Sequence, residues 1–132
     1  MAGSVKDLAA YRRECAHGDL DAARALLELG KFRQSLNRSY YAIFHAIRAV
    51  NALDEFDSRK HSGVIAHFNQ YHVKTGEFPK EISRMIHMAS DMREHADYED
   101  FFLASRQEAE EQLKNAGEVL ACVDRYLQAR QI

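Results

Sequence analysis

Apolar residues return every three or four positions along residues 36–50, and this spacing constrains the fold more than any other feature of the chain. An α-helix completes a turn every 3.6 residues, so these positions share one helical face. They are Leu36, Tyr40, Ile43, Ile47 and Val50. A continuous apolar stripe of this kind is buried against other elements. The spacing therefore predicts a central core helix from about Phe32 to Leu53.

The rest of the chain shows the same helical spacing, divided by residues that start or stop helices. Ser4 and Ser105 suit the N-cap position, Gly30 suits the left-handed position after a helix end, and Pro79 suits the first helical position. The expected helices cover residues 4–30, 32–53, 60–73, 79–98 and 105–132.

Strand-like alternation of useful length is absent from the sequence. With short loops between the helices, neighbouring helices are expected to run antiparallel. We therefore expect one domain over residues 1–132, an all-α antiparallel bundle of four or five helices. The third helix is expected to place four apolar residues on one side, namely Val64, Ile65, Phe68 and Tyr71.

The composition is that of a globular domain, with 46% hydrophobic and 29% charged residues. The net charge is −2, so any contact with RNA must use a local basic patch. Cys15 and Cys122 are expected to fill apolar space and not to form a disulfide framework. No signal-peptide core begins the chain, and no apolar run approaches the roughly 20 residues that span a membrane, so we expect a cytoplasmic protein without a membrane partner.

A second row of side chains follows the edge of the central stripe: Arg38, Tyr41, His45 and Arg48. Arg38 and His45 are two turns apart, roughly 10.5 Å along the axis, and point the same way. A long arginine side chain could reach the same ligand as the histidine. The alternative is a packing role, in which His45 is hydrogen bonded at the edge of the core and Tyr41 is mostly buried.

The end of the fourth helix is another candidate site, because Arg93 and Asp97 lie four residues apart and can pair. In a structural interpretation, Tyr98 closes the helix end beside this pair. In a functional interpretation, Asp97 holds Arg93 toward a phosphate and Tyr98 stacks on a base or ribose. Lys60 and His61, at the start of the third helix, either cap it or meet a phosphate there.

Three stretches together resemble one known family. They are residues 38–46 (Arg-Ser-Tyr-Tyr-Ala-Ile-Phe-His-Ala), 60–65 (Lys-His-Ser-Gly-Val-Ile) and 93–98 (Arg-Glu-His-Ala-Asp-Tyr). In this order they resemble the HEPN domain (higher eukaryotes and prokaryotes nucleotide-binding), and most closely its small stand-alone prokaryotic branch. The resemblance implies a homodimer with a shared cleft. It also implies a minimal nucleotidyltransferase as partner in a toxin–antitoxin-like pair.

The resembling family includes RNases that need no metal ion and that carry an arginine followed, after four to six residues, by a histidine. Arginine binds phosphate and histidine transfers protons. Two such pairs occur here, Arg12 with His17 and Arg38 with His45, as many as random placement gives. At the family's usual place, before the last helix, Arg93 is followed by a histidine only at position 95, which is too close. The chain therefore departs from the ribonuclease motif there.

The sequence favours a HEPN-type protein that binds nucleotide or RNA, with metal-independent endoribonuclease activity left open. For cleavage, two arginines would hold the phosphate and one of two histidines would act as acid–base; these are Arg38, Arg93, His45 and His95. The candidate nucleotide- or RNA-binding residues are Tyr41, Lys60, His61, Asp97 and Tyr98. The alternative is a non-catalytic helical module that dimerises and docks a partner.

No cofactor and no metal ion are expected. His61, His67 and His72 are five or six residues apart, so we expect them to scatter around the helix. They lack the spacing of four that helical zinc sites favour, and no acidic or cysteine partner is expected to complete a set.

Overall fold

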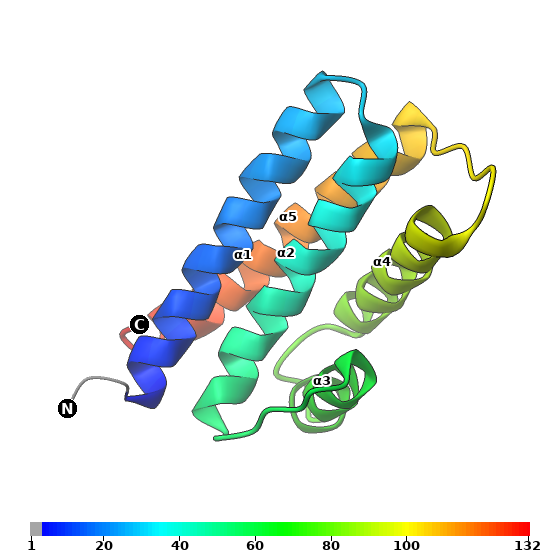
Figure 1. The fold of residues 1–132 in the computed structure, drawn as a ribbon. Coiled ribbons are helices and arrows are strands. Elements are labelled where there is room, and N and C mark those ends of the chain that lie inside the picture. Colours follow the sequence, from blue (N-terminus) through cyan, green and yellow to red (C-terminus); the bar gives the residue numbers. More distant parts are fainter. Residues whose placement is uncertain (1–3) are drawn as a thin grey trace.

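The computed structural model describes residues 4–132, which form five α-helices and a short π-helical segment and contain no strand (Figure 1). The elements are α1 (Val5–Glu28), α2 (Phe32–Leu53), α3 (His61–Phe68), η1 (Asn69–Val73), α4 (Lys80–Tyr98) and α5 (Arg106–Gln128). Residues 1–3, the start of the predicted single domain, lie outside this description. The predicted all-α bundle is confirmed. Within residues 4–132, none of the helices combines the length and the apolar character that crossing a membrane requires.

Helix α2 is the centre of the bundle and contacts α1, α3, α4 and α5. Figure 1 shows α1 and α2 running side by side. The five residues of the predicted apolar stripe are each exposed by 1% or less. Burying one large aliphatic side chain contributes about 1.5–3 kcal/mol, so the stripe is a main source of stability.

The helix ends follow the predicted signals closely. The Ser4 hydroxyl accepts a hydrogen bond from the backbone N–H of Asp7 at 3.1 Å, and Gly30 has a φ of +77° after the end of α1. Ser105 and Glu108 form the reciprocal capping box at the start of α5. Pro79 lies one residue earlier than expected, at the N-cap of α4.

The predicted third helix changes its turn after Phe68. In η1 the backbone N–H of Lys74 donates to the carbonyl of Asn69, five residues back, at 2.9 Å. In this wider turn His72, four positions after Phe68, faces inward, and Tyr71, three positions after Phe68, faces outward. His72 is accordingly buried (3% exposed) and Tyr71 is not (51% exposed). The expectation that Tyr71 shares the apolar side is therefore wrong.

Candidate functional site

Aromatic and basic side chains from three helices meet beside the core. We call Tyr40, Tyr41 and Phe44 of α2, His61 of α3 and Arg93 of α4 the aromatic–basic cluster. The Tyr40 hydroxyl lies 2.9 Å from Nδ1 of His61, whose ring centroid is 4.1 Å from that of Phe44. The Cζ atom of Arg93 lies 4.7 Å from the Tyr40 ring centroid and 5.8 Å from that of Tyr41. One guanidinium therefore lies against two aromatic rings, an arrangement that cation–π attraction favours.

Local sequence explains how α3 comes to lie there. The buried Asn51 side chain donates to the Val64 carbonyl at 3.1 Å, which ties α3 to the end of α2. A Cβ atom at Gly63 would lie 2.5 Å from the Ser58 hydroxyl, so glycine allows the preceding loop to pass close to α3. His61, the first residue of α3, is thereby turned toward α2.

Arg38 and Arg93 both lie against one aromatic ring. The Cζ atom of Arg38 is 4.9 Å from the ring centroid of Tyr41, which Arg93 also approaches. Asn37 completes the connection: its Oδ1 accepts from Arg38 at 2.7 Å, and its amide donates to Asp97 at 3.0 Å. Asp97 also accepts from Arg93 at 3.4 Å, which is the predicted ion pair. The two predicted phosphate-binding arginines, Arg38 and Arg93, thus lie against the same ring.

His45 and Arg38 share a carboxylate, as their common orientation on α2 predicts. Asp19 of α1 accepts from Arg38 at 3.1 Å and lies 3.6 Å from Nε2 of His45. Burial lowers the pKa of His45 below its ordinary value; Asp19 acts in the opposite direction, and nearby arginines lower the pKa further. His45 is therefore partly enclosed by its neighbours, and sequence reasoning did not find Asp19 because it comes from another helix.

His61 is the histidine that the structure places at the centre of the cluster. Burial lowers its pKa, and the positive charges of Arg93 and Arg48 lower it further. Burial raises the pKa of its partner Tyr40 to about 12. Both groups are therefore neutral at neutral pH, and a neutral imidazole can accept a proton.

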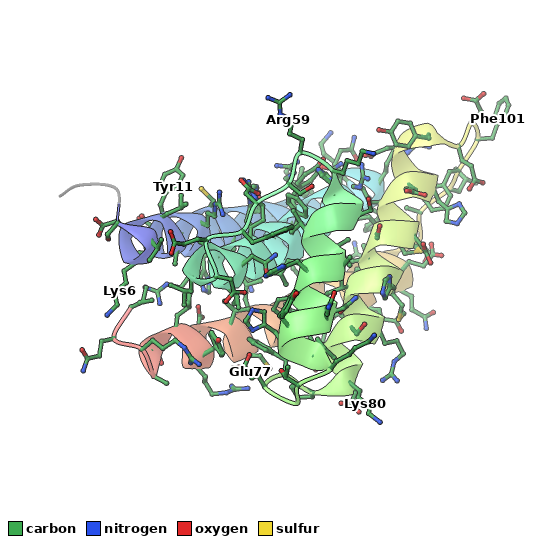
Figure 2. The ribbon with its side chains drawn as sticks, turned by 90° about the horizontal axis from the view of Figure 1, so that it is seen from below. Lys6, Tyr11, Arg59, Glu77, Lys80 and Phe101 are labelled. Atoms are coloured by element: carbon green, nitrogen blue, oxygen red, sulfur yellow. The ribbon has the colours of Figure 1, made fainter. Side chains whose placement is uncertain are left out.

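Two hollows open on either side of His61. One, of about 500 Å³, is lined by Phe44, Arg48, Asp57, Ser58, Arg59 and His61. The other, of about 370 Å³, is lined in part by His61, Asn69, His87, Arg93 and Glu94. Figure 2 shows Arg59 projecting from the loop before α3. Each hollow thus pairs the same imidazole with at least one arginine.

Asp57 holds the basic side of the first hollow in place. It accepts hydrogen bonds from Arg48 at 2.7 Å and from Arg12 at 3.1 Å. The hydrogen bond from Arg48 is the largest influence on the Asp57 carboxyl and keeps its pKa below the ordinary value, against the opposing effect of burial. The sequence did not predict that Arg12 and Asp57 meet, because no helical spacing relates the two residues.

Other predicted residues lie elsewhere. His95 pairs with Glu99, and its ring stacks near that of Phe102. Lys60 is exposed at the N-cap of α3 and makes no side-chain cap hydrogen bond. Tyr98 is 76% exposed. Burial acts to lower the pKa of Arg93, but the neighbouring Tyr40, Tyr41 and Asp97 raise it overall.

The lowered pKa values of His45 and His61 predict a pH dependence of stability. The unfolded chain takes up protons on these groups near pH 6.5, whereas the folded chain takes them up only at lower pH. The free energy of unfolding should therefore fall as the pH is lowered below about 6.5. Urea unfolding at pH 7.5 and pH 5.5 measures this, with a His45→Gln/His61→Gln double variant as comparison. Equal losses in the wild type and the double variant would contradict the assignment.

The protein is an all-helical bundle in which a histidine, tyrosines and arginines share one site. Comparisons with known proteins give its family. A model of the HEPN domain matches residues 9–126, so the chain belongs to the HEPN domain family. A "UPF0332 protein" of Thermotoga maritima is 29% identical over 118 residues, 89% of each chain. The Methanocaldococcus jannaschii protein named "Putative toxin MJ0142" is 29% identical over 128 residues, 92% of this chain and 87% of the relative.

A solved structure supports the fold independently. The crystal structure of TT1696 from Thermus thermophilus matches with a TM-score of 0.74 at 21% sequence identity. The match covers 89% of this chain and 96% of that one. The arrangement of helices is therefore shared over nearly the whole domain.

Proposed function

We propose that this chain is the HEPN component of a toxin–antitoxin-type pair, and that it binds RNA and cleaves it without a metal ion at the aromatic–basic cluster. HEPN membership and the toxin name of the archaeal relative support the first part. The observation that carries the second part is the convergence of Tyr40, His61 and Arg93, with a hollow on each side of the histidine.

Arg93 is suited to hold a phosphate. Its side chain is 11% exposed, and its Nε atom is buried without a hydrogen-bond partner among residues 4–132. Guanidinium groups bind phosphate through paired N–H donors, and Arg93 has a donor in reserve. Asp97 and the tyrosine rings fix the direction of the side chain, so little conformational freedom is lost on binding.

The aromatic side chains of the cluster support RNA in particular. Single-stranded RNA is recognised through bases that stack on aromatic rings and through contacts to its phosphates. Tyr41 offers a partly exposed ring close to both Arg38 and Arg93. Arg48 and Arg59 add positive charge at the other hollow, which gives a local basic patch on a chain of net charge −2.

His61 supplies the proton transfer in this proposal. The Tyr40 hydroxyl lies 2.9 Å from Nδ1 of His61. In the tautomer of His61 that carries its proton on Nδ1, the ring donates to the Tyr40 oxygen and Nε2 is unprotonated toward the substrate. That nitrogen takes the proton of the ribose 2′-hydroxyl as its oxygen attacks the adjacent phosphorus and a 2′,3′-cyclic phosphate forms. The bond to the 5′-oxygen breaks, and this leaving oxygen takes a proton from water and becomes a hydroxyl. Arg93 stabilises the charge that grows on the phosphate oxygens. His61 thus takes the acid–base role for which His45 and His95 were the candidates in the sequence.

The proposed assembly is a homodimer with a minimal nucleotidyltransferase as partner. Both proposals rest on the family resemblance. In a homodimer, two copies of the cluster could face one groove and lengthen the RNA-binding surface. Co-expression of the chain with a nucleotidyltransferase encoded next to it, followed by co-purification, tests the partner.

RNA binding is the first test of the proposed site. We expect Arg93→Gln to weaken the binding of a short single-stranded RNA by roughly 10- to 100-fold, since hydrogen bonds to charged groups contribute about 1.5–3 kcal/mol. Fluorescence anisotropy of labelled RNA in EDTA at fixed salt measures this. Arg24→Gln is the matched control, because Arg24 is exposed on α1 and pairs there with Asp21.

Two results decide the outcome. Weakened binding by Arg93→Gln alone, with an unchanged circular dichroism spectrum, supports the site. If the wild type binds none of the RNAs at micromolar protein, or if both variants bind equally, the RNA-binding proposal fails. The non-catalytic module that dimerises and docks a partner would then be the better account.

A further inference from the structure

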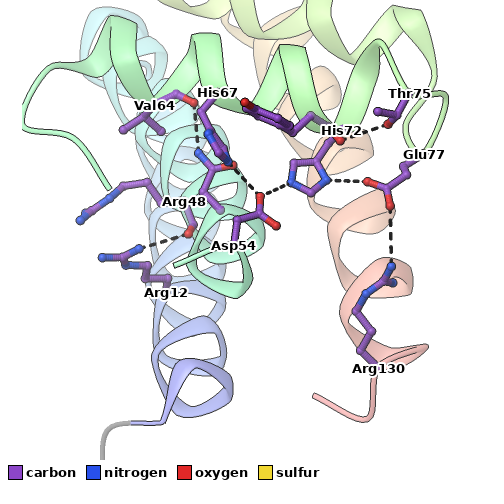
Figure 3. Close-up of polar contacts among 11 residues, drawn as sticks. Arg12, Arg48, Asp54, Val64, His67, His72, Thr75, Glu77 and Arg130 are labelled. Carbon is purple, nitrogen blue, oxygen red and sulfur yellow. Dashed lines mark hydrogen bonds and ion pairs between the residues drawn. The ribbon is translucent and has the colours of Figure 1, made fainter. Parts of the chain in front are cut away.

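We propose that Asp54, His67 and His72 form a binding site for a divalent transition-metal ion, with zinc as the best match. The three residues lie where the C-terminal end of α2 meets α3 and η1 (Figure 3). None of them belongs to the aromatic–basic cluster. The site is therefore a feature separate from the proposed RNA chemistry.

The three side chains converge on one point. Oδ2 of Asp54 lies 2.9 Å from Nε2 of His67 and 2.6 Å from Nε2 of His72. One ligand atom from each residue lies within 4.8 Å of the other two. Figure 3 shows both imidazole rings directed at the carboxylate. A small outward shift of the carboxylate would leave a cation in contact with two nitrogens and one oxygen.

The π-helical segment is what brings the two histidines together. Residues five positions apart are roughly 140° apart around a regular α-helix. The wider turn of η1 reduces this angle, so His67 and His72 face the same carboxylate. The expectation that these histidines scatter and lack an acidic partner is therefore wrong. Single π-helical turns are frequent at functional sites.

A second carboxylate, that of Glu77, orients the His72 ring, and metal-binding histidines usually have such a partner. Nδ1 of His72 lies 2.6 Å from Oε1 of Glu77, so each ring nitrogen faces a carboxylate. Histidines that bind metal ions through one nitrogen commonly donate the other N–H to a carboxylate. Glu77 is in turn 3.9 Å from Arg130, whose side chain Figure 3 shows beyond it. This chain of contacts fixes the orientation of the His72 ring.

Both imidazoles are also held by packing. The His72 side chain is 4% exposed, and the His67 ring stacks on Phe56 with centroids 3.9 Å apart and planes 7° apart. Asp54 keeps 33% of its side chain exposed, which leaves a route for an ion and for a water ligand. Rigid histidines with an accessible fourth position suit the tetrahedral geometry that zinc prefers.

The test is metal uptake by the full chain after treatment with a chelator. We expect one equivalent of zinc per chain by isothermal titration calorimetry, a higher melting temperature with zinc, and visible absorption bands of tetrahedral cobalt(II) on substitution. Asp54→Asn and His67→Gln should abolish the cobalt bands. Glu77→Gln should weaken zinc binding by roughly 10- to 100-fold, the usual effect of removing the partner of a metal-binding histidine.

His17 offers a matched control. It also faces a carboxylate, that of Asp124 at 2.9 Å. Within residues 4–132, however, it belongs to no cluster of three metal-ligating side chains. His17→Gln should bind zinc as the wild type does. Failure of the wild type to take up zinc at micromolar concentration would overturn the proposal, as would uptake that Asp54→Asn and His67→Gln leave unchanged. Asp54, His67 and His72 would then be a hydrogen-bonded cluster only. Because the readout is metal uptake, the result is independent of RNA binding.

Discussion

A His61→Ala variant should cleave RNA roughly 100- to 10,000-fold more slowly than the wild type, which is the usual contribution of a positioned acid–base group. The reason lies in the contacts of His61. Its ring is held by the Tyr40 hydroxyl and Phe44, and burial together with two arginines keeps its pKa low enough for a neutral ring at pH 7. Cleavage of a labelled RNA in EDTA, under single-turnover conditions, measures the rate.

A His95→Ala variant provides the matched control, because His95 is a histidine of α4 that pairs with Glu99 outside the cluster. Its cleavage rate should equal that of the wild type. The pH profile separates chemistry from structure: the acid limb of the wild-type rate should lie below pH 6.5, the ordinary pKa, because the pKa of His61 is lowered. If His61→Ala cleaves RNA at the wild-type rate, or loses no more activity than His95→Ala does, His61 is not the acid–base group.

The sequence was sufficient for the four long helices and the apolar stripe of α2 because both depend on local rules. The apolar stripe of α2 repeats at the helical period, and every member of it is buried. The Ser105 capping box and Gly30 mark their helix ends where their backbone preferences require. These signals act within a few residues, so a single sequence contains them in full.

The site was predictable only along one helix. The shared orientation of Arg38 and His45 follows from their spacing, and both reach the same carboxylate. That carboxylate belongs to Asp19 of α1, and the partner of Tyr40 is His61 of α3; helical spacing does not specify which residues of two different helices meet. Contacts between helices depend on crossing angles and loop lengths, which the periodicity of one helix does not contain.

The π-helical segment is a backbone feature that the spacing of residues within one helix also did not predict. Helix propensity alone does not predict a π-helical turn at residues 69–73. The segment forms next to Phe68 and Phe78, whose ring centroids are 4.9 Å apart in the core. The wider turn accompanies the burial of these two rings and turns His67 and His72 toward one carboxylate. Sequence reasoning assigned this segment to a regular helix because helical spacing contains no information on such contacts.

Phe68 should therefore be one of the most sensitive positions in the chain. Phe68→Ala is expected to lower the free energy of unfolding by about 3–5 kcal/mol, because it leaves a cavity where a fully buried ring contacts Phe78 and His72. Urea unfolding followed by circular dichroism measures the change. A domain of this size has a total stability of about 5–15 kcal/mol, so the variant should remain folded in buffer only if the wild type lies well within that range.

Phe101→Ala is the matched control, because it makes the same substitution at an exposed position. Phe101 is 98% exposed and projects at the far end of the molecule (Figure 2). Its free energy of unfolding should stay within about 0.5 kcal/mol of the wild type. Phe68→Leu adds a graded test, because leucine refills much of the cavity and should recover part of the loss. Equal effects at positions 68 and 101 would contradict the burial of Phe68. A large loss for Phe68→Ala with partial recovery in Phe68→Leu would instead show that the packing of this ring against Phe78 and His72, where α3 and η1 meet, is a main source of the stability of the bundle.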